Sequence, residues 1–128
     1  QSVADATEAV AHGIDAIAVS NHGGRQLDRS PSPVSLIAPI ANAISGAVPI
    51  ICDGGIRRGA DIVTALSLGA SACTMGRSYL YGLGAAGEQG VERAYDMLVD
   101  EMRRTMALTG VCTIAEIDST LTTHHLRS

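Results

Sequence analysis

A histidine and an arginine separated by two glycines are the residues whose types and spacing suggest chemistry most directly. His22 and Arg25 follow Ile14–Val19, an apolar run that is typical of a buried strand. Gly23 and Gly24 between them allow a tight turn and the close approach of a ligand to the backbone. Histidine titrates near neutral pH, whereas arginine stays charged and can grip two oxygens. The pair therefore suits a substrate with a proton to lose and a carboxylate to hold.

Taken alone, a histidine and an arginine at this spacing more often belong to a solvated loop, because short motifs arise frequently by chance. Two further clusters that contain glycine and arginine change that balance. Asp53–Gly59 follows the apolar run Val48–Cys52, and Gly76 with Arg77 follows the weaker apolar segment 71–75. All three clusters therefore come directly after predicted strands.

The second and third clusters have the composition of an anion site. Gly54 and Gly55 let backbone N–H groups point at an anion, and the N-terminus of a following helix adds partial positive charge. Arg57 and Arg77 can supply full charge and bidentate contacts. The alternative is that the glycines only make a tight turn and that Arg57 and Arg58 are solvated. Two arginines at a helix start oppose the helix dipole, which favours the anion site.

The elements that must position these clusters alternate along the chain. We expect Pro39 to lie in the first turn of its helix or to shorten it, and residues 119–128 to form a tail that frays. The strand over 48–52 is expected to be buried on both faces. Strands are predicted over 14–20, 48–52 and 71–75, and helices over 2–11, 36–44, between Gly59 and Gly69, over 79–83 and over 90–108, with one more turn over 113–117.

Strands that alternate with helices predict parallel βαβ units and therefore an α/β fold. Parallel α/β proteins place their sites at the carboxyl ends of the strands, both in barrels and in open sheets. In barrels a phosphate site commonly lies in the loops after the last two strands. The positions of the second and third clusters, one helix and one strand apart, agree with such a site.

Composition excludes several kinds of function. The chain of 128 residues carries a net charge of -4, which argues against a nucleic-acid surface, and it contains no lysine for Schiff-base catalysis. It has no Phe or Trp for base stacking, and no apolar run of membrane-spanning length. We expect Cys52, Cys73 and Cys112 to be reduced thiols in a cytoplasmic protein, the first two of them buried. No metal site is expected.

The three clusters together closely resemble the FMN-dependent α-hydroxy acid oxidases and dehydrogenases, such as glycolate oxidase and quinone-linked L-lactate dehydrogenase. Ser20–Asp28 is similar to the active-site signature of that family. Asp53–Gly59 and Gly76-Arg77 are similar to its two FMN-phosphate loops. The stretch 79–83 and the long last helix also match. The resemblance extends over essentially the whole chain and implies a (β/α)8 barrel.

The resemblance implies a role for each site residue. His22 would be the catalytic base and would contact substrate, and Arg25 would clamp the substrate carboxylate. The FMN cofactor would be held by Ser20, Asp53, Gly54, Gly55, Arg57, Gly76 and Arg77. The reaction implied is oxidation of an L-2-hydroxy acid of the lactate or glycolate type to the 2-oxo acid.

Three departures from the family pattern define what else is expected. Residues 1–128 hold only about three strands and resemble strands six to eight, so they form a single partial domain whose partner is the missing N-terminal part of the barrel. The flavin-side lysine of the family should come just before Gln1, and Ser78 stands where many members have proline. The family also implies a tetramer when the barrel is complete, and a peripheral membrane location if the enzyme is quinone-linked.

Two alternatives stay open at the level of the sequence. A phosphate-binding barrel that acts as an isomerase or synthase would use the same phosphate loops, but it would not need the His22–Arg25 segment. A truncated relative that binds nothing, or only the FMN phosphate, would retain the motifs without catalysis.

Overall fold

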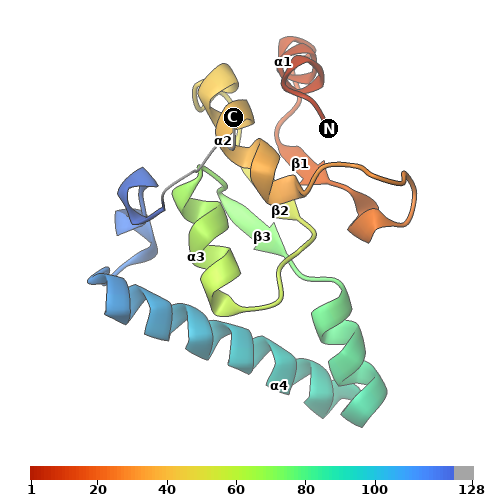
Figure 1. Cartoon of the computed structure of the whole chain (residues 1–128), viewed down its shortest axis with the longest axis vertical. Coiled ribbons are helices and arrows are strands. Elements are labelled where there is room, and N and C mark those ends of the chain that lie inside the picture. The colour runs from red at the N-terminus through yellow and green to blue at the C-terminus, as the bar shows by residue number, and fades with distance from the viewer. Residues whose placement is uncertain (123–128) are drawn as a thin grey trace.

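The structure, a computed structural model, describes residues 1–122 (Figure 1). Its helices and strands alternate as predicted, and 3-10 turns interrupt or follow them at His22–Gly24, Ile114–Glu116 and Ser119–Leu121. The main elements are α1 (Val3–Ala11), β1 (Ile17–Ser20), α2 (Pro33–Ile44), β2 (Ile50–Asp53), α3 (Gly59–Ser67), β3 (Ala72–Thr74) and α4 (Arg77–Thr109).

The three strands form one parallel sheet in the order β1-β2-β3. Parallel neighbours require a crossover connection, and here α2 and α3 provide the two crossovers. This arrangement confirms the predicted α/β fold of the chain. Within residues 1–122, β1 and β3 each have one edge without a neighbouring strand.

The two faces of the sheet are very different. Val19 and Cys52 are paired in register, and both are buried beneath the helices. Ile51, on the opposite face of β2, is only half-buried, and its neighbours in the register, Ala18 and Ala72, are exposed. The prediction that residues 48–52 are buried on both faces was therefore wrong, because within residues 1–122 the helices cover only one face.

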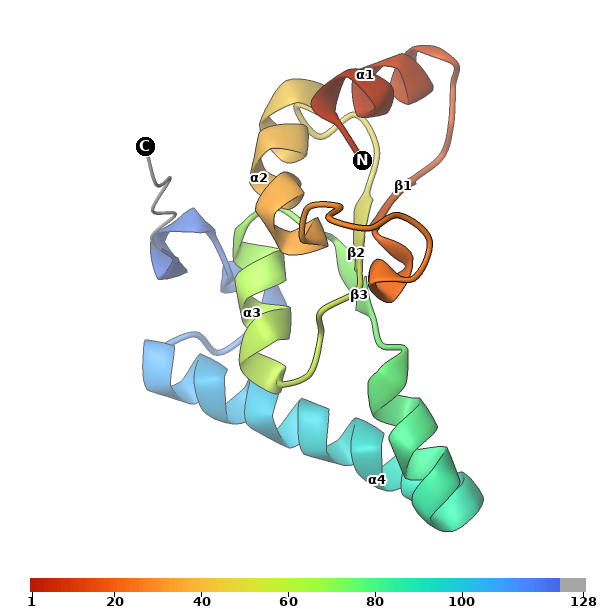
Figure 2. The same cartoon turned by 45° about the vertical axis from the view of Figure 1, so that its right-hand side comes forward.

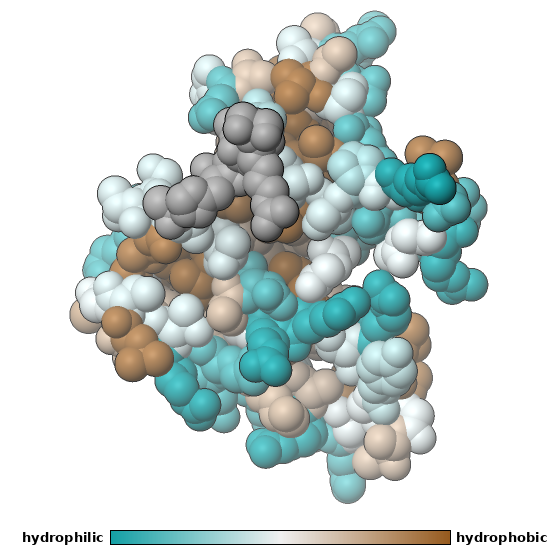
Figure 3. Space-filling view, viewed as in Figure 1, coloured by the Kyte–Doolittle hydropathy of each residue, from teal (hydrophilic) through white to brown (hydrophobic). Residues whose placement is uncertain are grey.

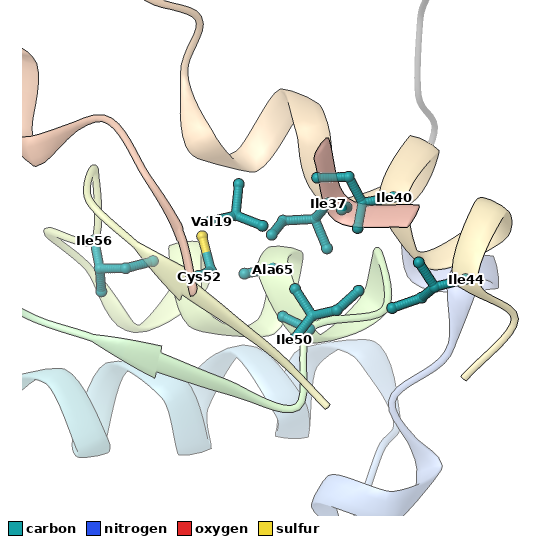
Figure 4. Packing of buried hydrophobic residues seen from close by; sticks show 10 residues of the cluster. Val19, Ile37, Ile40, Ile44, Ile50, Cys52, Ile56 and Ala65 are labelled. Carbon is teal, nitrogen blue, oxygen red and sulfur yellow. The ribbon is translucent and has the colours of Figure 1, made fainter. Parts of the chain in front are cut away.

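The core lies between the sheet and α2 and α3 (Figure 4). Ile37 and Ile40 of α2 are almost fully buried, and they meet Val19 and Cys52 from the sheet and Ala65 from α3. Each fully buried isoleucine contributes about 1.5 to 3 kcal/mol relative to an exposed one. This packing fixes where the carboxyl ends of β1 and β2 lie relative to the helices.

Helix α2 passes straight through Pro39, which corrects the expectation that this proline lies in the first turn or shortens the helix. The helix begins earlier than predicted, with Pro33 in its first turn, where the missing N–H costs nothing. Pro39 is exposed, while Ile37 and Ile40 on either side of it are buried. The burial of these neighbours offsets the lost hydrogen bond.

Helix α4 consists of two parts that meet at a sharp bend (Figure 2). The backbone at Ala86 and Gly87 is not helical, and this corresponds to the turn predicted between helices 79–83 and 90–108. Gly82 and Gly90 pack backbone to backbone across the bend, where a Cβ on Gly82 would lie 2.2 Å from the carbonyl oxygen of Gly90. The bend therefore depends on the absence of side chains at both positions.

The segment after α4 returns to α3. The Ser67 hydroxyl, which is buried, lies 2.9 Å from the Thr122 hydroxyl. The first residues of the predicted tail are thus tied to α3, and residues 123–128 of that tail lie outside the described residues. In the described part of the chain, no helix combines the length and apolarity that a membrane span needs.

Candidate active site

A row of three polar side chains occupies the carboxyl end of the sheet. Ser20 pairs with Asp53, and Asp53 pairs with Thr74, each as the last residue of its strand. The Asp53 carboxylate accepts a 2.5 Å hydrogen bond from the Ser20 hydroxyl and a second, short one from the Thr74 hydroxyl. The parallel register thus gathers side chains from three strands around one carboxylate.

These hydrogen bonds favour the ionised form of Asp53. The Ser20 hydroxyl lowers the pKa of the Asp53 carboxyl below its ordinary value, and the Thr74 hydroxyl lowers it further. Partial burial opposes the shift, and the nearby His22 adds a small contribution that also lowers the pKa. Asp53 is therefore a hydrogen-bond acceptor at neutral pH.

The turn after β1 is built on the same row. The backbone N–H of His22 donates to the Ser20 hydroxyl oxygen at 3.0 Å, and the Asn21 side chain accepts from the Gly23 N–H at 3.0 Å. His22 has a left-handed backbone with φ 52°, an unusual conformation for a residue other than glycine. His22 lies in this turn and Arg25 follows it, and both residues are exposed.

One large cavity joins the three clusters. It has a volume of about 1040 Å³ and opens between the loop after β1 and the first part of α4, where Figure 3 shows the surface hollowed. Ser20 does not line this cavity but supports Asp53 from the side. All the other residues predicted for the site do line it: His22, Arg25, Asp53, Gly54, Gly55, Arg57, Gly76 and Arg77.

The arginines of the cavity are available to an anion. Within residues 1–122, neither Arg57 nor Arg77 forms an ion pair with a carboxylate, and both are exposed. Arg77 instead reaches toward the first cluster, where its Nη2 donates to the Gly23 carbonyl at 3.5 Å. The third cluster therefore contacts the turn that carries His22.

The two helix N-termini at this edge differ in the availability of their amide groups. At α3, Asp61 accepts from the N–H groups of Arg57 and Arg58 at 2.9 Å each, and Glu101 accepts from Gly59 at 3.0 Å. At α4, the N-cap residue Gly76 provides no side-chain cap. An anion would therefore find helix amides without a side-chain acceptor at α4, whereas carboxylates already accept from the first amide of α3 and from the two amides before it.

The loop after β2 leaves room for a ligand on its backbone. Gly54 and Gly55 both have positive φ, at 110° and 85°, which favours glycine. A Cβ on Gly55 would point into open space. The donor set of two unpaired arginines, an uncapped helix N-terminus and an open glycine loop fits the phosphate of FMN, and the Asp53 acceptor fits a hydroxyl of its ribityl chain.

Sequence reasoning missed three residues of this site. Thr74 is the last residue of β3 and could have been found by aligning the strand ends. Asp61 could have been found as a carboxylate in the first turn of its helix. Glu101 gave no local signal, because its partner Gly59 is distant in the chain. Among residues 1–122, no group of three His, Cys, Asp or Glu side chains is placed to hold a metal ion.

The fold and site define a class of protein: a parallel α/β domain with a cavity at the carboxyl ends of its strands, lined by His22 and by arginines. Residues 1–124 match the family model of the FMN-dependent dehydrogenases. The chain belongs to that family, which confirms the resemblance drawn from the three clusters and FMN as its expected cofactor. This match favours an FMN-dependent dehydrogenase over the alternative of an isomerase or synthase.

Individual relatives support the same assignment. A peroxisomal (S)-2-hydroxyacid oxidase of Arabidopsis thaliana is 48% identical over 124 residues, which cover 97% of this chain and 33% of that protein. An L-lactate dehydrogenase of Haemophilus influenzae is 54% identical over 113 residues, 88% of this chain and 30% of that protein. The chain thus spans about a third of the length of the curated relatives it matches.

Solved structures match the fold closely. A lactate oxidase of Pediococcus acidilactici superposes with a TM-score of 0.89 at 40% identity, over 93% of this chain and 33% of that one. A mandelate oxidase superposes with a TM-score of 0.88 at 41% identity, over 92% of this chain and 36% of that one. Both comparisons cover nearly all of the described fold.

Proposed function

We propose that this chain is the carboxyl-terminal part, strands six to eight, of a (β/α)8 barrel that oxidises an L-2-hydroxy acid of the lactate or glycolate type to the 2-oxo acid with FMN. The observation that carries this proposal is the single cavity that joins His22 and Arg25 to the anion-binding loops. The free edges of β1 and β3 and the uncovered face around Ile51 fit a sheet that continues in the rest of the protein.

The phosphate of FMN is assigned to Gly76 and Arg77 at the start of α4, with Arg57 opposite. Asp53 is assigned to a ribityl hydroxyl rather than to the phosphate, because an ionised carboxylate repels an anion and accepts from a hydroxyl. Gly54 and Gly55 let the cofactor approach the backbone. Ser20, which lies behind Asp53, acts by holding that carboxylate.

The substrate is assigned to the exposed pair at the turn after β1. Arg25 holds the carboxylate of the hydroxy acid through its two-pronged guanidinium group. His22 receives one of the two protons that the CH(OH) group of the substrate loses. When bound, FMN would supply the acceptor for the two electrons and the second proton. The product is the 2-oxo acid.

The protein's location and assembly are further parts of the proposal. We propose a cytoplasmic location and a homotetramer of complete barrels. Size-exclusion chromatography with light scattering tests the assembly. Cell fractionation tests the location, since the Arabidopsis relative carries a peroxisomal name.

The test uses the complete protein with FMN and an L-2-hydroxy acid such as L-lactate or glycolate. We expect flavin binding and then bleaching of the visible flavin band when substrate is added without oxygen. Arg77→Ala should weaken FMN binding at least tenfold, because it removes a charged donor to the phosphate. Arg104→Ala is the matched control on an exposed turn of the same helix.

Three outcomes would count against the proposal. Binding of FMN without bleaching by any 2-hydroxy acid would support the alternative of a non-catalytic relative. Absence of FMN binding would contradict the cofactor assignment. Equal effects of Arg77→Ala and Arg104→Ala would contradict the assignment of the phosphate to the start of α4.

A further inference from the structure

Helix α4 borders the candidate site at two separate places. Its amino-terminal end, with Gly76 and Arg77, forms one wall of the cavity, and Glu101, far along the same helix, lines the cavity beside the start of α3. Figure 1 shows the second part of α4 running beneath the start of α3. Helix α4 therefore forms one wall of the cavity with its own N-terminus and also lies beside the loop after β2.

Glu101 makes a specific contact at the end of that loop. Its Oε2 accepts a hydrogen bond from the backbone N–H of Gly59, the first residue of α3, at 3.0 Å. The two preceding amides are held by Asp61, which belongs to α3 itself. Glu101 thus provides an N-terminal cap for α3 that comes from a different element.

The backbone at Gly59 lies very close to the backbone of α4. A Cβ on Gly59 would lie 1.9 Å from the backbone nitrogen of Met102 and 2.6 Å from the carbonyl oxygen of Leu98. The start of α3 is therefore pressed directly onto the backbone of α4. Gly59 is buried, and Glu101 is half-buried beside it.

The loop is tied to α4 at a second point, Ile56. The hydroxyl of Ser78, in the first turn of the helix, donates to the carbonyl of Ile56 at 3.2 Å. Between Ser78 and Glu101, α4 fixes the segment that carries Arg57 at both of its ends. A change at either tie would move the arginine relative to Gly76 and Arg77.

We propose that Glu101 is a positioning residue for the FMN phosphate: it fixes the start of α3 and thereby holds Arg57 opposite the N-terminus of α4. The proposal rests on the proposed function. The same carboxylate accepts from the Gly59 amide, and Asp61 accepts from the Arg57 and Arg58 amides, so these three amides do not compete for the anion. The phosphate is thereby directed to Gly76 and Arg77.

The test compares binding of FMN with binding of riboflavin, which has the same ring and ribityl chain but no phosphate. It uses the complete protein and follows flavin fluorescence. The variants are Glu101→Ala, which removes the cap, Glu101→Gln, which keeps an acceptor of the same length, and Glu101→Asp, which keeps the charge but shortens the reach. Glu92→Ala, at an exposed position of the same helix, is the control.

We expect Glu101→Ala and Glu101→Asp to weaken FMN binding about tenfold, the size of effect that loss of a helix cap can produce. Riboflavin binding should change little, and Glu101→Gln should restore FMN binding to within about threefold of the wild type. If Glu101→Ala does not fold, Glu101→Asp carries the comparison. Circular dichroism confirms which variants are folded.

Several results would overturn the inference. Equal losses of FMN and riboflavin binding would show that Glu101 supports the fold in general and not the phosphate loop. Unchanged or tighter FMN binding in Glu101→Ala and Glu101→Asp would show that it has no positioning role. Failure of the wild type to bind either flavin would overturn the proposed function, and this inference with it. If the wild type binds FMN, the comparison of the variants tests the role of Glu101 alone.

Discussion

The Ser20 hydroxyl donates a 2.5 Å hydrogen bond to the Asp53 carboxylate across the β1-β2 pair, and its oxygen accepts from the N–H of His22. One hydroxyl thus links the carboxylate at the centre of the sheet edge to the turn that presents the proposed base. Ser20 and Asp53 meet because each is the last residue of its strand and the parallel register pairs them.

The lowered pKa of Asp53 predicts how stability depends on pH. A carboxyl whose pKa is depressed by folding contributes stability that is fully present above its ordinary value near 3.8 and is lost as the pH falls through the depressed value. We expect Asp53→Asn to lower the free energy of unfolding by about 1 kcal/mol at pH 7, since one of two acceptors is lost from a partly exposed group.

The measurement is urea unfolding of the wild type and Asp53→Asn at pH 7 and at pH 3. The difference between the two proteins should shrink at pH 3, because the carboxyl of the unfolded chain, with an ordinary pKa near 3.8, is mostly protonated there. A difference that stayed constant between the two pH values would contradict the assignment of the hydrogen bonds to the ionised form.

The bend in α4 predicts a strong dependence on two glycines. Gly82→Ala and Gly90→Ala should each destabilise the protein by about 3 kcal/mol or more, because the new Cβ would meet backbone atoms at 2.2 Å and 1.9 Å. Gly84→Ala is the matched control, since it lies in the same helix and its Cβ would meet nothing within 4 Å. This control should be neutral or stabilising by up to about 1 kcal/mol.

Thermal unfolding monitored by circular dichroism distinguishes these variants. If Gly82→Ala were as stable as Gly84→Ala, the two parts of α4 would not pack as closely as described. The prediction concerns stability alone and holds whatever the protein binds.

The separate roles proposed for His22 and Arg25 predict different kinetic effects. His22→Ala should abolish flavin reduction while FMN stays bound, because the base contributes to proton transfer and not to the phosphate site. Arg25→Lys should mainly raise KM for the hydroxy acid, by about tenfold, since lysine keeps the charge but loses the bidentate contact. Anaerobic stopped-flow measurement of flavin bleaching tests both variants. Loss of FMN with unchanged turnover per bound flavin in His22→Ala would contradict the role given to the base.

The environment of the cysteines predicts their reactivity. Burial raises the pKa of the Cys73 thiol to about 12, and burial also raises the pKa of Cys52. At pH 8 both thiols should stay protonated and resist iodoacetamide, because the thiolate is the reactive form. Cys112 is exposed and should be labelled first.

Mass spectrometry of the labelled native protein, followed by labelling in denaturant, checks this order. Cys52 and Cys73 should gain label only after unfolding. Labelling of Cys73 in the native protein at the rate of Cys112 would show that the covered face of the sheet is open.

The sequence alone determined the elements and the chemistry they carry. The apolar runs and glycines placed β1, β2 and β3 to within a few residues, and the clusters after them placed His22 and the arginines at the carboxyl ends of the strands. These features are local, because strand period, helix caps and turn residues act over only a few positions. Burial of the strand at 48–52 could not be judged in this way, because it depends on what covers each face of the sheet.

Only the tertiary structure decided how these parts meet. It showed that Thr74 joins Ser20 at Asp53, that carboxylates accept from amides at the start of α3 while the start of α4 has no side-chain cap, and that Glu101 holds Gly59. Each of these contacts joins residues far apart in the chain. Such contacts depend on sheet register and helix packing, which local propensity does not encode.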